Sequence, residues 1–209
     1  MSEPNQESGH RWFAALYDRF MAPGERRLGR SIRSRLVDGL TGRVLEIGAG
    51  TGANFEYYPQ AVQIVATEPD QHMMARAQKR LAELSTSNIE LRQTPAAPLP
   101  FEDGEFDHVI SALVLCTVPD QARALAEARR VLKPDGTLRF WEHVRNDESR
   151  FWGTVQDVIT PVWRWVGAGC HPNRRTERAI QDAGFRIDWL ETVRMNPGTP
   201  AIYGVARKV

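Results

Sequence analysis

The sequence predicts an α/β domain with a mainly parallel sheet, helices on both faces of the sheet and a terminal antiparallel strand. Three observations lead to this prediction. Short apolar segments of strand character alternate with helical segments along most of the chain, the first of these strands runs into a glycine-rich turn, and the chain ends in two neighbouring strand segments. Repeated strand and helix units of this kind form parallel sheets that are covered on both faces.

Size and composition favour one globular domain. The 209 residues fit a single domain, 1–209, with a substantial core. Apolar residues make up 42% and charged residues 25%, a mix typical of globular rather than disordered or membrane proteins. The net charge of +1 gives no reason to expect nucleic acid as a partner. The longest apolar stretches, such as 109–116, are shorter than the roughly 20 residues that a transmembrane helix needs.

Cysteine usage indicates a reducing compartment. Cys116 and Cys170 lie in different predicted elements and form no Cys-x-x-Cys pair, so we expect no metal site. No secretory segment is recognised over residues 2–11. We therefore expect a reduced, cytoplasmic protein.

The first two thirds of the chain are expected to alternate between strand and helix. Residues 1–40 are expected to hold two helices, one on the apolar spacing of residues 12–20 and an arginine-rich one that ends near Leu40. Five strands are predicted at 43–47, 63–67, 89–92, 106–113 and 137–143. Helices are predicted to start at 53–58 and to span 70–84, capped by Asp70, and 120–132.

The last third departs from this alternation. Residues 146–175 are rich in aromatic side chains and are expected to form an inserted helix and loop over the carboxyl edge of the sheet, on the substrate side. A helix at 176–183, closed by Gly184, is followed by strands at 185–194 and 201–208, which are expected to pair antiparallel. These two strands bring the predicted total to seven.

A ligand site is expected at the glycine turn after the first strand, because open parallel sheets bind ligands where the strand order reverses. Gly48, Gly50 and Gly52 let the backbone approach a ligand, and the next helix offers free N–H groups to its anionic part. Glu68 ends the second strand, where a carboxylate accepts both hydroxyls of a ribose. The glycine pattern and this acid also fit NAD. Glu46 suits a positively charged amino group, which favours S-adenosylmethionine (SAM).

Four segments in order resemble the motifs of class I SAM-dependent methyltransferases. They are Val-Leu-Glu-Ile-Gly-Ala-Gly-Thr-Gly at 44–52, Thr-Glu-Pro-Asp at 67–70, the run from Leu-Pro-Phe to Phe-Asp at 99–107, and Leu-Lys-Pro-Asp-Gly at 132–136. Together they cover about residues 40–145. The resemblance implies a Rossmann-like, seven-stranded sheet, SAM as cofactor and S-adenosylhomocysteine as its product.

The resemblance also implies roles for individual residues at the cofactor. The glycines line the methionine end, Glu46 organises their loop and Glu68 binds the ribose. Tyr17 resembles an N-terminal tyrosine that reaches the SAM carboxylate, and Met73 packs against adenine; a place in the core is the alternative for both. Many members bind the adenine amine with an Asp before Leu-Pro-Phe, which is absent here, so that role falls to backbone around Ala96. The full set assigned to the cofactor is Tyr17, Glu46, Gly48, Ala49, Gly50, Gly52, Glu68, Pro69, Met73, Ala96, Ser111 and Leu113.

The acceptor is expected at the carboxyl ends of the fourth and fifth strands. Methyl transfer from a sulfonium mainly requires an aligned nucleophile and exclusion of water, so a catalytic base is optional. His143 is the candidate base, with a structural histidine as the alternative. Glu142 is a candidate to orient that imidazole or simply ends the strand. Cys116 is a candidate substrate contact, with core packing as the alternative.

Three segments of the acceptor side resemble the alkyl thiol methyltransferases. They are Leu-Val-Leu-Cys-Thr-Val at 113–118, Phe-Trp-Glu-His-Val at 140–144 and Gly-x-Gly-Cys at 167–170. The resemblance implies methylation of a small lipophilic thiol, and the tryptophans of 146–175 are expected either to line its pocket or to pack the insertion onto the sheet. The mammalian members carry a hydrophobic N-terminal anchor; none is recognised here, so we expect a soluble, bacterial-type relative.

Other acceptors and roles are compatible with the same cofactor site. O-, N- or C-methylation of a small metabolite, quinone precursor or lipid is the first alternative. A non-catalytic SAM-binding protein is the second, and an NAD-dependent oxidoreductase, disfavoured by Glu46, is the third.

Overall fold

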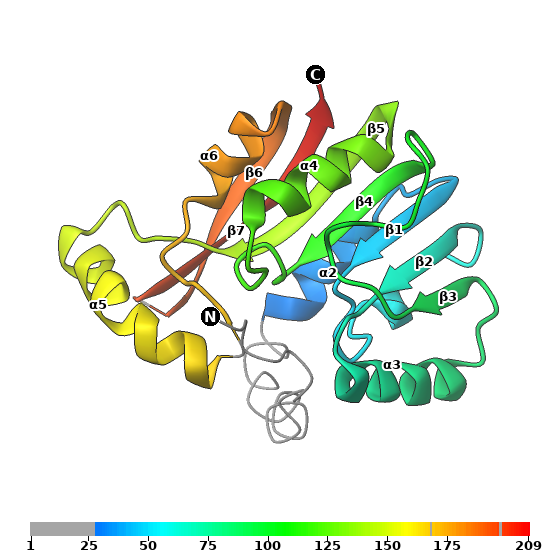
Figure 1. Cartoon of the computed structure of the whole chain (residues 1–209), viewed down its shortest axis with the longest axis horizontal. Coiled ribbons are helices and arrows are strands. Elements are labelled where there is room, and N and C mark those ends of the chain that lie inside the picture. The colour runs from blue at the N-terminus through cyan, green and yellow to red at the C-terminus, as the bar shows by residue number, and fades with distance from the viewer. Residues whose placement is uncertain (1–27, 168, 197) are drawn as a thin grey trace, which may run out of the picture.

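The centre of the protein is a seven-stranded sheet with the order β3-β2-β1-β4-β5-β7-β6 (Figure 1). The computed structural model describes residues 28–167, 169–196 and 198–209. The strands are β1 (Arg43–Ile47), β2 (Gln63–Thr67), β3 (Ile89–Arg92), β4 (Phe106–Ala112), β5 (Leu132–His143), β6 (Phe185–Asn196) and β7 (Thr199–Lys208). The helices are α2 (Arg30–Val37), α3 (Gln71–Leu84), α4 (Gln121–Val131), α5 (Arg150–Val166) and α6 (Thr176–Asp182).

The strand pairing matches the predicted topology. β1 pairs in parallel with β2 on one side and with β4 on the other, so the strand order reverses beside β1. β4 and β5 are also parallel, whereas β7 runs antiparallel to both β5 and β6. The mainly parallel sheet with a terminal antiparallel strand is therefore confirmed, and the switch point lies at the glycine turn after β1.

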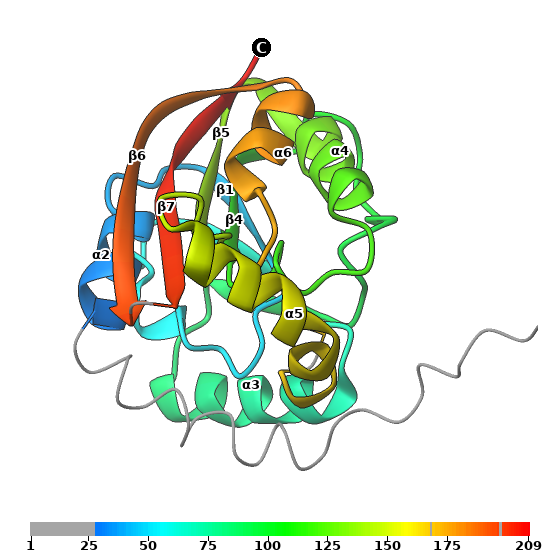
Figure 2. The same ribbon diagram turned by 90° about the vertical axis from the view of Figure 1, so that its left-hand side faces the viewer.

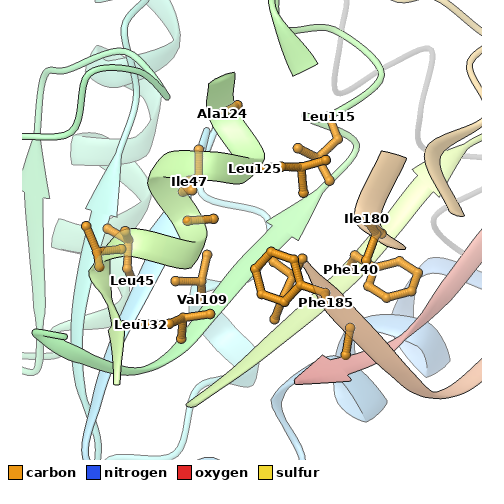
Figure 3. Close-up of a cluster of buried hydrophobic side chains, with 14 of the residues drawn as sticks. Leu45, Ile47, Val109, Leu115, Ala124, Leu125, Leu132, Phe140, Ile180 and Phe185 are labelled. Atoms are coloured by element: carbon orange, nitrogen blue, oxygen red, sulfur yellow. The ribbon is translucent and has the colours of Figure 1, made fainter. Parts of the chain in front are cut away.

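Alternate residues of the central strands build two separate cores. On one face, Leu45 and Val109 pack with residues of α4 and α6 (Figure 3). On the other face, Val44 and Ile110 pack with residues at the end of α2 and in α3. This alternation follows from the two-residue period of a strand. The edge-on view shows α2 on the opposite side of the sheet from α4 and α6 (Figure 2), so helices cover both faces.

Most predicted elements are present; β6 and β7 each extend two residues further toward their connecting turn than predicted, and three other segments also differ. The segment 53–58 forms only a short 3₁₀ turn, η2 (Phe55–Tyr57), because Pro59 disfavours a helical conformation at the residue before it. β4 ends one residue early, at Ala112, because the backbone of Leu113 is left-handed with φ 62°. β5 starts at Leu132 rather than 137, since Leu132 pairs with Phe106 of β4. The helix predicted at residues 12–20 lies outside the described residues.

The inserted segment 146–175 contains α5, which lies at the end of the sheet where the parallel strands end (Figures 1 and 2). The face of α5 that meets the domain is polar. Gln156 is 1% exposed; its Nε2 donates to the carbonyl oxygens of Val144 and Pro172 at 3.1 and 3.0 Å, and its Oε1 accepts from the amide of Asn146 at 2.7 Å. A buried amide with all these partners fixes α5 to the strand end.

The aromatic side chains of α5 are largely exposed in the described structure. Phe151, Trp152, Trp163 and Trp165 are 68%, 36%, 43% and 79% exposed, so Phe151 and Trp165 do not pack the insertion onto the sheet, whereas Trp163 contacts Cys170. Their part in an acceptor pocket stays a prediction. The helix is amphipathic with its polar face inward, which sequence periodicity alone does not reveal. Across the described ranges, we find no helix that combines the length and the apolar character needed to span a membrane.

Candidate cofactor and acceptor site

The glycine turn after β1 has the backbone geometry that a close ligand requires. Gly48 has φ 65° and Gly50 has φ 58°, in the left-handed region that favours glycine. A Cβ atom at Gly48 would lie 2.7 Å from a methyl carbon of Val114, so the turn and the segment after β4 are in close contact. A Cβ atom at Gly50 would meet no atom of the described residues within 4 Å. The turn is therefore packed on one side and open on the other, as a cofactor cradle requires.

Glu68 closes this turn from the end of β2. Its Oε2 accepts the amide of Gly50 at 2.8 Å and its Oε1 accepts the amide of Asp70 at 2.9 Å. The carboxylate is 7% exposed; burial raises its pKa, and the two backbone donors act against that rise. Each oxygen keeps a second acceptor position, so binding of ribose hydroxyls by Glu68 stays compatible with this geometry and stays a prediction.

Glu46 is the centre of a buried polar network. Asn54 Nδ2 donates to its Oε1 at 2.6 Å, and the Tyr58 hydroxyl donates to its Oε2 at 2.9 Å. Arg33 Nη1 in turn donates to Asn54 Oδ1. Burial raises the pKa of Glu46, whereas these donors and the Arg33 charge lower it. The network ties the end of β1 to α2 and to the turn after the glycines, which fits the expected organising role of Glu46.

Sequence reasoning missed the three other members of this network, Arg33, Asn54 and Tyr58. Arg33 lies in the predicted arginine-rich helix, where nothing in the sequence distinguishes it from its neighbours, yet it is 4% exposed. The sequence predicts Asn54 and Tyr58 only as residues of a helix that starts at 53–58. Asn54 and Tyr58 are polar and directly follow the glycine turn. This was the available signal, because the buried carboxylate of Glu46 needs hydrogen-bond donors.

The remaining cofactor residues surround the ends of β2 and β3. Met73 lies in the first turn of α3, where its amide donates to Asp70 Oδ1 at 3.0 Å; the predicted Asp cap is thus confirmed. Pro69 is exposed and precedes that cap, and Ala96 is half-buried beside the main core. Tyr17 lies outside the described residues. Contacts of Pro69, Met73 and Ala96 with adenine therefore stay predictions.

Glu142 holds the turn that follows β4. Its side chain is fully buried, and Ser111 Oγ donates to Oε1 at 2.6 Å. The backbone amides that donate to this carboxylate, at 3.0 to 3.1 Å, are those of Val114, Leu115 and Cys116. Burial raises its pKa, and these four donors lower it. Because neighbouring residues of a strand point to opposite faces, Glu142 positions the turn rather than the imidazole of His143, which corrects the expected orienting role.

His143 lies in a cluster with both cysteines. Its Nδ1 is 3.9 Å from Cys116 Sγ and 3.7 Å from Cys170 Sγ, and the two sulfurs are 3.8 Å apart. Both thiols are free and buried. The sulfur contact with Cys116, together with His143 and Trp163, lowers the pKa of Cys170 to about 5, and the same contact together with burial raises the pKa of Cys116. The cluster favours one negative sulfur.

The sequence did not predict this cluster, because the two cysteines lie on separate elements. Cys116 follows β4, His143 ends β5 and Cys170 follows α5. The expectation of no metal site depended on that separation along the chain, and the fold removes it: one ligand atom from each residue lies within 4.8 Å of the others. The carboxyl edge of the sheet thus places a polar cradle beside β1 and a sulfur and imidazole cluster beside β5.

Comparison with known proteins agrees with this geometry. Residues 45–140 match the family model described as a methyltransferase domain. The chain is 34% identical over 185 residues to human thiol S-methyltransferase TMT1B, covering 82% of this chain and 75% of that protein. It is 30% identical to the ubiquinone/menaquinone biosynthesis C-methyltransferase UbiE of Pseudomonas syringae, covering 91% of this chain and 84% of that protein.

Solved structures show the same fold at lower identity. A SAM-dependent methyltransferase from Aquifex aeolicus aligns with a TM-score of 0.66 at 17% identity, covering 92% of this chain and 97% of that one. The YcgJ protein of Bacillus subtilis aligns with a TM-score of 0.70 at 17% identity, covering 85% of this chain and 97% of that one. With the open glycine cradle and the acid at the end of β2, these likenesses lead to one conclusion. The chain belongs to the class I methyltransferases, enzymes that use SAM as the methyl donor for small molecules.

Proposed function

We propose that the enzyme methylates the sulfur of a small, lipophilic thiol. The observation that carries this proposal is the 34% identity to human thiol S-methyltransferase TMT1B over 82% of the chain. The related human protein TMT1A matches at 33% identity over 94% of the chain. A likeness of that extent includes the acceptor side of the site as well as the cofactor motifs.

The chemistry of the acceptor side supports a thiol. When bound, SAM supplies an activated methyl group on a sulfonium. The residues of the chain have to align the acceptor, exclude water and favour its anionic form. A free thiol with a pKa of about 8.5 is already a few per cent thiolate at neutral pH. The contact with the Cys116 thiol, together with His143, lowers the pKa of Cys170 to about 5. These groups can therefore stabilise one thiolate, the form in which an acceptor sulfur reacts.

The surface of α5 supports a lipophilic acceptor. Phe151, Val158, Val162 and Trp165 are each at least two thirds exposed on the helix that leads to Cys170. A group of exposed apolar side chains beside a site marks a surface that binds apolar molecules. We therefore expect alkyl or aryl thiols to be preferred over small polar thiols.

A second candidate function is methylation of oxygen, nitrogen or carbon. The identity to UbiE favours a C-methyl acceptor, and a phosphatidylethanolamine N-methyltransferase of Cereibacter sphaeroides matches at 30% identity over 78% of the chain. Membership of the methyltransferases removes the oxidoreductase alternative.

Product analysis tests the proposal. The purified enzyme is incubated with methyl-labelled SAM and a panel of alkyl thiols, aryl thiols, phenols and amines, and the products are identified by mass. Labelled thioethers are expected. Labelled ethers or amines in their place would contradict the thiol acceptor while leaving the methyltransferase assignment intact.

A matched pair of histidine variants tests the acceptor side. His143→Ala should lower kcat by about 100-fold or more while changing the Kd for SAM less than about twofold, since proton-transfer groups contribute 10²–10⁴-fold. His108→Asn serves as the control, because His108 lies at the other end of β4 from Cys116. An unchanged rate of His143→Ala across several pH values would exclude His143 from thiol activation.

A further inference from the structure

The donor atoms of Cys116, His143 and Cys170 form a nearly equilateral triangle, with sides of 3.7, 3.8 and 3.9 Å. Metal–sulfur bonds of about 2.3 Å and metal–nitrogen bonds of about 2.0–2.1 Å at tetrahedral angles separate two sulfurs by about 3.8 Å and a sulfur from a nitrogen by about 3.6 Å. The observed triangle agrees with one face of such a tetrahedron to within a few tenths of an ångström. We propose that these three residues bind a zinc-like divalent cation, and that the acceptor thiolate takes its fourth position.

The cluster is held in place by contacts that do not involve the sulfurs. The amide of Cys116 donates to Glu142 Oε2 at 3.0 Å, and its carbonyl accepts the amide of His171 at 2.7 Å. Gly169 has φ 89°, and a Cβ atom there would lie 3.2 Å from the carbonyl oxygen of Thr117. The loop that carries Cys170 is therefore fastened to the Cys116 backbone. Three donors that stay close without the cation lose little conformational freedom on binding it.

Charge and burial suit a divalent cation. Cys116 is 1% exposed and Cys170 is 8% exposed. Two thiolates and one neutral imidazole balance the double charge of the cation, so the loaded site is neutral and its burial carries no net ionic charge. Thiolate and imidazole are the ligands that zinc prefers over magnesium or calcium. The donor set thus selects a zinc-like ion.

The number of ligands distinguishes a reacting site from a structural one. Within the described ranges this group has three members. Structural zinc sites have four protein ligands, whereas catalytic ones have three and keep a position for water or substrate. The assignment of the fourth position to the substrate depends on the proposed thiol acceptor.

The reaction at the fourth position balances. The acceptor thiol gives its proton to solvent as its sulfur bonds to the cation. A lone pair of that sulfur then attacks the methyl carbon of SAM; the new sulfur–carbon bond forms as the sulfonium–carbon bond breaks, and its electron pair remains on S-adenosylhomocysteine. The neutral thioether is a weak ligand and leaves. With the cation bound, His143 would act as a ligand and the cation would acidify the thiol, so the loss of kcat expected for His143→Ala would then come from loss of the cation.

The cluster lies beside the cofactor turn. Val114 contacts Gly48, and Cys116 follows two residues later in the same Glu142-bound turn. An acceptor on the cation would therefore be held next to the segment that lines the methionine end of the cradle.

Cobalt binding to the whole, untagged protein tests the site without turnover. Reduced protein is stripped with a chelator and titrated with Co²⁺, and thiolate-to-cobalt absorption in the near ultraviolet is recorded; Zn²⁺ is then used to displace Co²⁺. We expect one equivalent per chain. Cys116→Ser and Cys170→Ser should weaken binding by more than about 100-fold, because loss of even an outer-shell partner costs 10–100-fold. His108→Asn, with both cysteines intact, should bind as the wild type does.

Each outcome decides one part of the inference. Absence of the absorption in the wild type, or its survival in both cysteine variants with native circular dichroism, would overturn the site. Conversion of the two thiols to a disulfide in protein that binds no Co²⁺ would overturn it too and would identify a redox pair. Addition of an alkyl thiol should strengthen the absorption of the Co²⁺ form; no change would overturn the fourth-position role. Thioether production by chelated protein at the full rate would overturn that role and leave the thiol function standing.

Discussion

Replacing Gly48 by alanine tests the close approach between the glycine turn and the segment after β4. A side chain at this position must adopt φ 65° and must place its Cβ atom 2.7 Å from Val114. Gly50→Ala is the matched control: its φ of 58° imposes the same backbone cost, but its Cβ atom would meet nothing within 4 Å in the part of the chain that the structure describes. The pair separates backbone strain from steric overlap.

The expected magnitudes follow from these two terms. A non-glycine residue in the left-handed region costs about 1–2 kcal/mol. Overpacking in a close contact adds about 1–3 kcal/mol. Gly50→Ala should therefore lower the free energy of unfolding by about 1–2 kcal/mol and Gly48→Ala by roughly 2–5 kcal/mol. For a protein of this size each kcal/mol shifts the thermal midpoint by about 2–4 °C.

Urea unfolding followed by circular dichroism measures the difference, and a second substitution identifies its cause. Val114→Ala removes the two methyl carbons nearest Gly48 and leaves Cβ, which is 3.3 Å from the built atom. Adding Val114→Ala to Gly48→Ala should restore about 1 kcal/mol of the free energy of unfolding relative to the sum of the two single effects. Coupling of this size is typical of residues in contact. Equal stabilities of Gly48→Ala and Gly50→Ala, or zero coupling to Val114→Ala, would refute the packing argument. SAM affinity should still fall in Gly50→Ala, whose new methyl group occupies the open side of the cradle.

Three further substitutions test the cofactor acid, a buried imidazole and the anchor of α5. Glu68→Ala should weaken SAM binding by about tenfold or more in calorimetry, because hydrogen bonds to a charged group contribute about 1.5–3 kcal/mol; a Kd within twofold of the wild type would contradict the ribose assignment. Burial lowers the pKa of His108, and its Nε2 has no hydrogen-bond partner in the described structure, so the unfolded chain gains a proton near pH 6.5 that the folded protein excludes. Stability should therefore fall as the pH drops below about 6.5, and His108→Asn should reduce that fall in unfolding measurements; an identical pH dependence would exclude His108 as its source. Gln156→Leu leaves three backbone groups without their partner and should lower the free energy of unfolding by about 3 kcal/mol, whereas a neutral effect would show that α5 is not anchored through this amide.

Local signals predicted the fold well where they were strong. The bounds of β1, β2 and β3 match the predicted 43–47, 63–67 and 89–92, since each is a short apolar run between turn residues. Asp70 and Asp120 mark the starts of α3 and α4, because each accepts backbone amides of the first turn. The early start of β5 was not predictable in this way, because residues 132–136 look like a turn until β4 is present as a partner.

The sequence predicts the cofactor half of the site better than the acceptor half. Glu46, Glu68 and the glycines fall within two short motifs, so their proximity follows from adjacent parallel strands. The acceptor cluster has no such local pattern: 27 residues separate Cys116 from His143, and another 27 separate His143 from Cys170. Only the fold, with α5 returning the chain to the end of β5, brings them together.

One strand end links these two halves. Glu142 binds the turn that carries both Val114, which contacts the glycine turn, and Cys116, which belongs to the acceptor cluster. His143, the next residue, faces the two sulfurs. Because side chains alternate along β5, the carboxylate of Glu142 lies on one side of the strand and the imidazole of His143 on the other. Among the described residues, the donors to Glu142 come from 111–116, and the insertion binds the same turn through the amide of His171, which donates to the carbonyl oxygen of Cys116. The acceptor cluster and the wall of the cofactor cradle are therefore fixed by one turn, so a change in this turn should affect both.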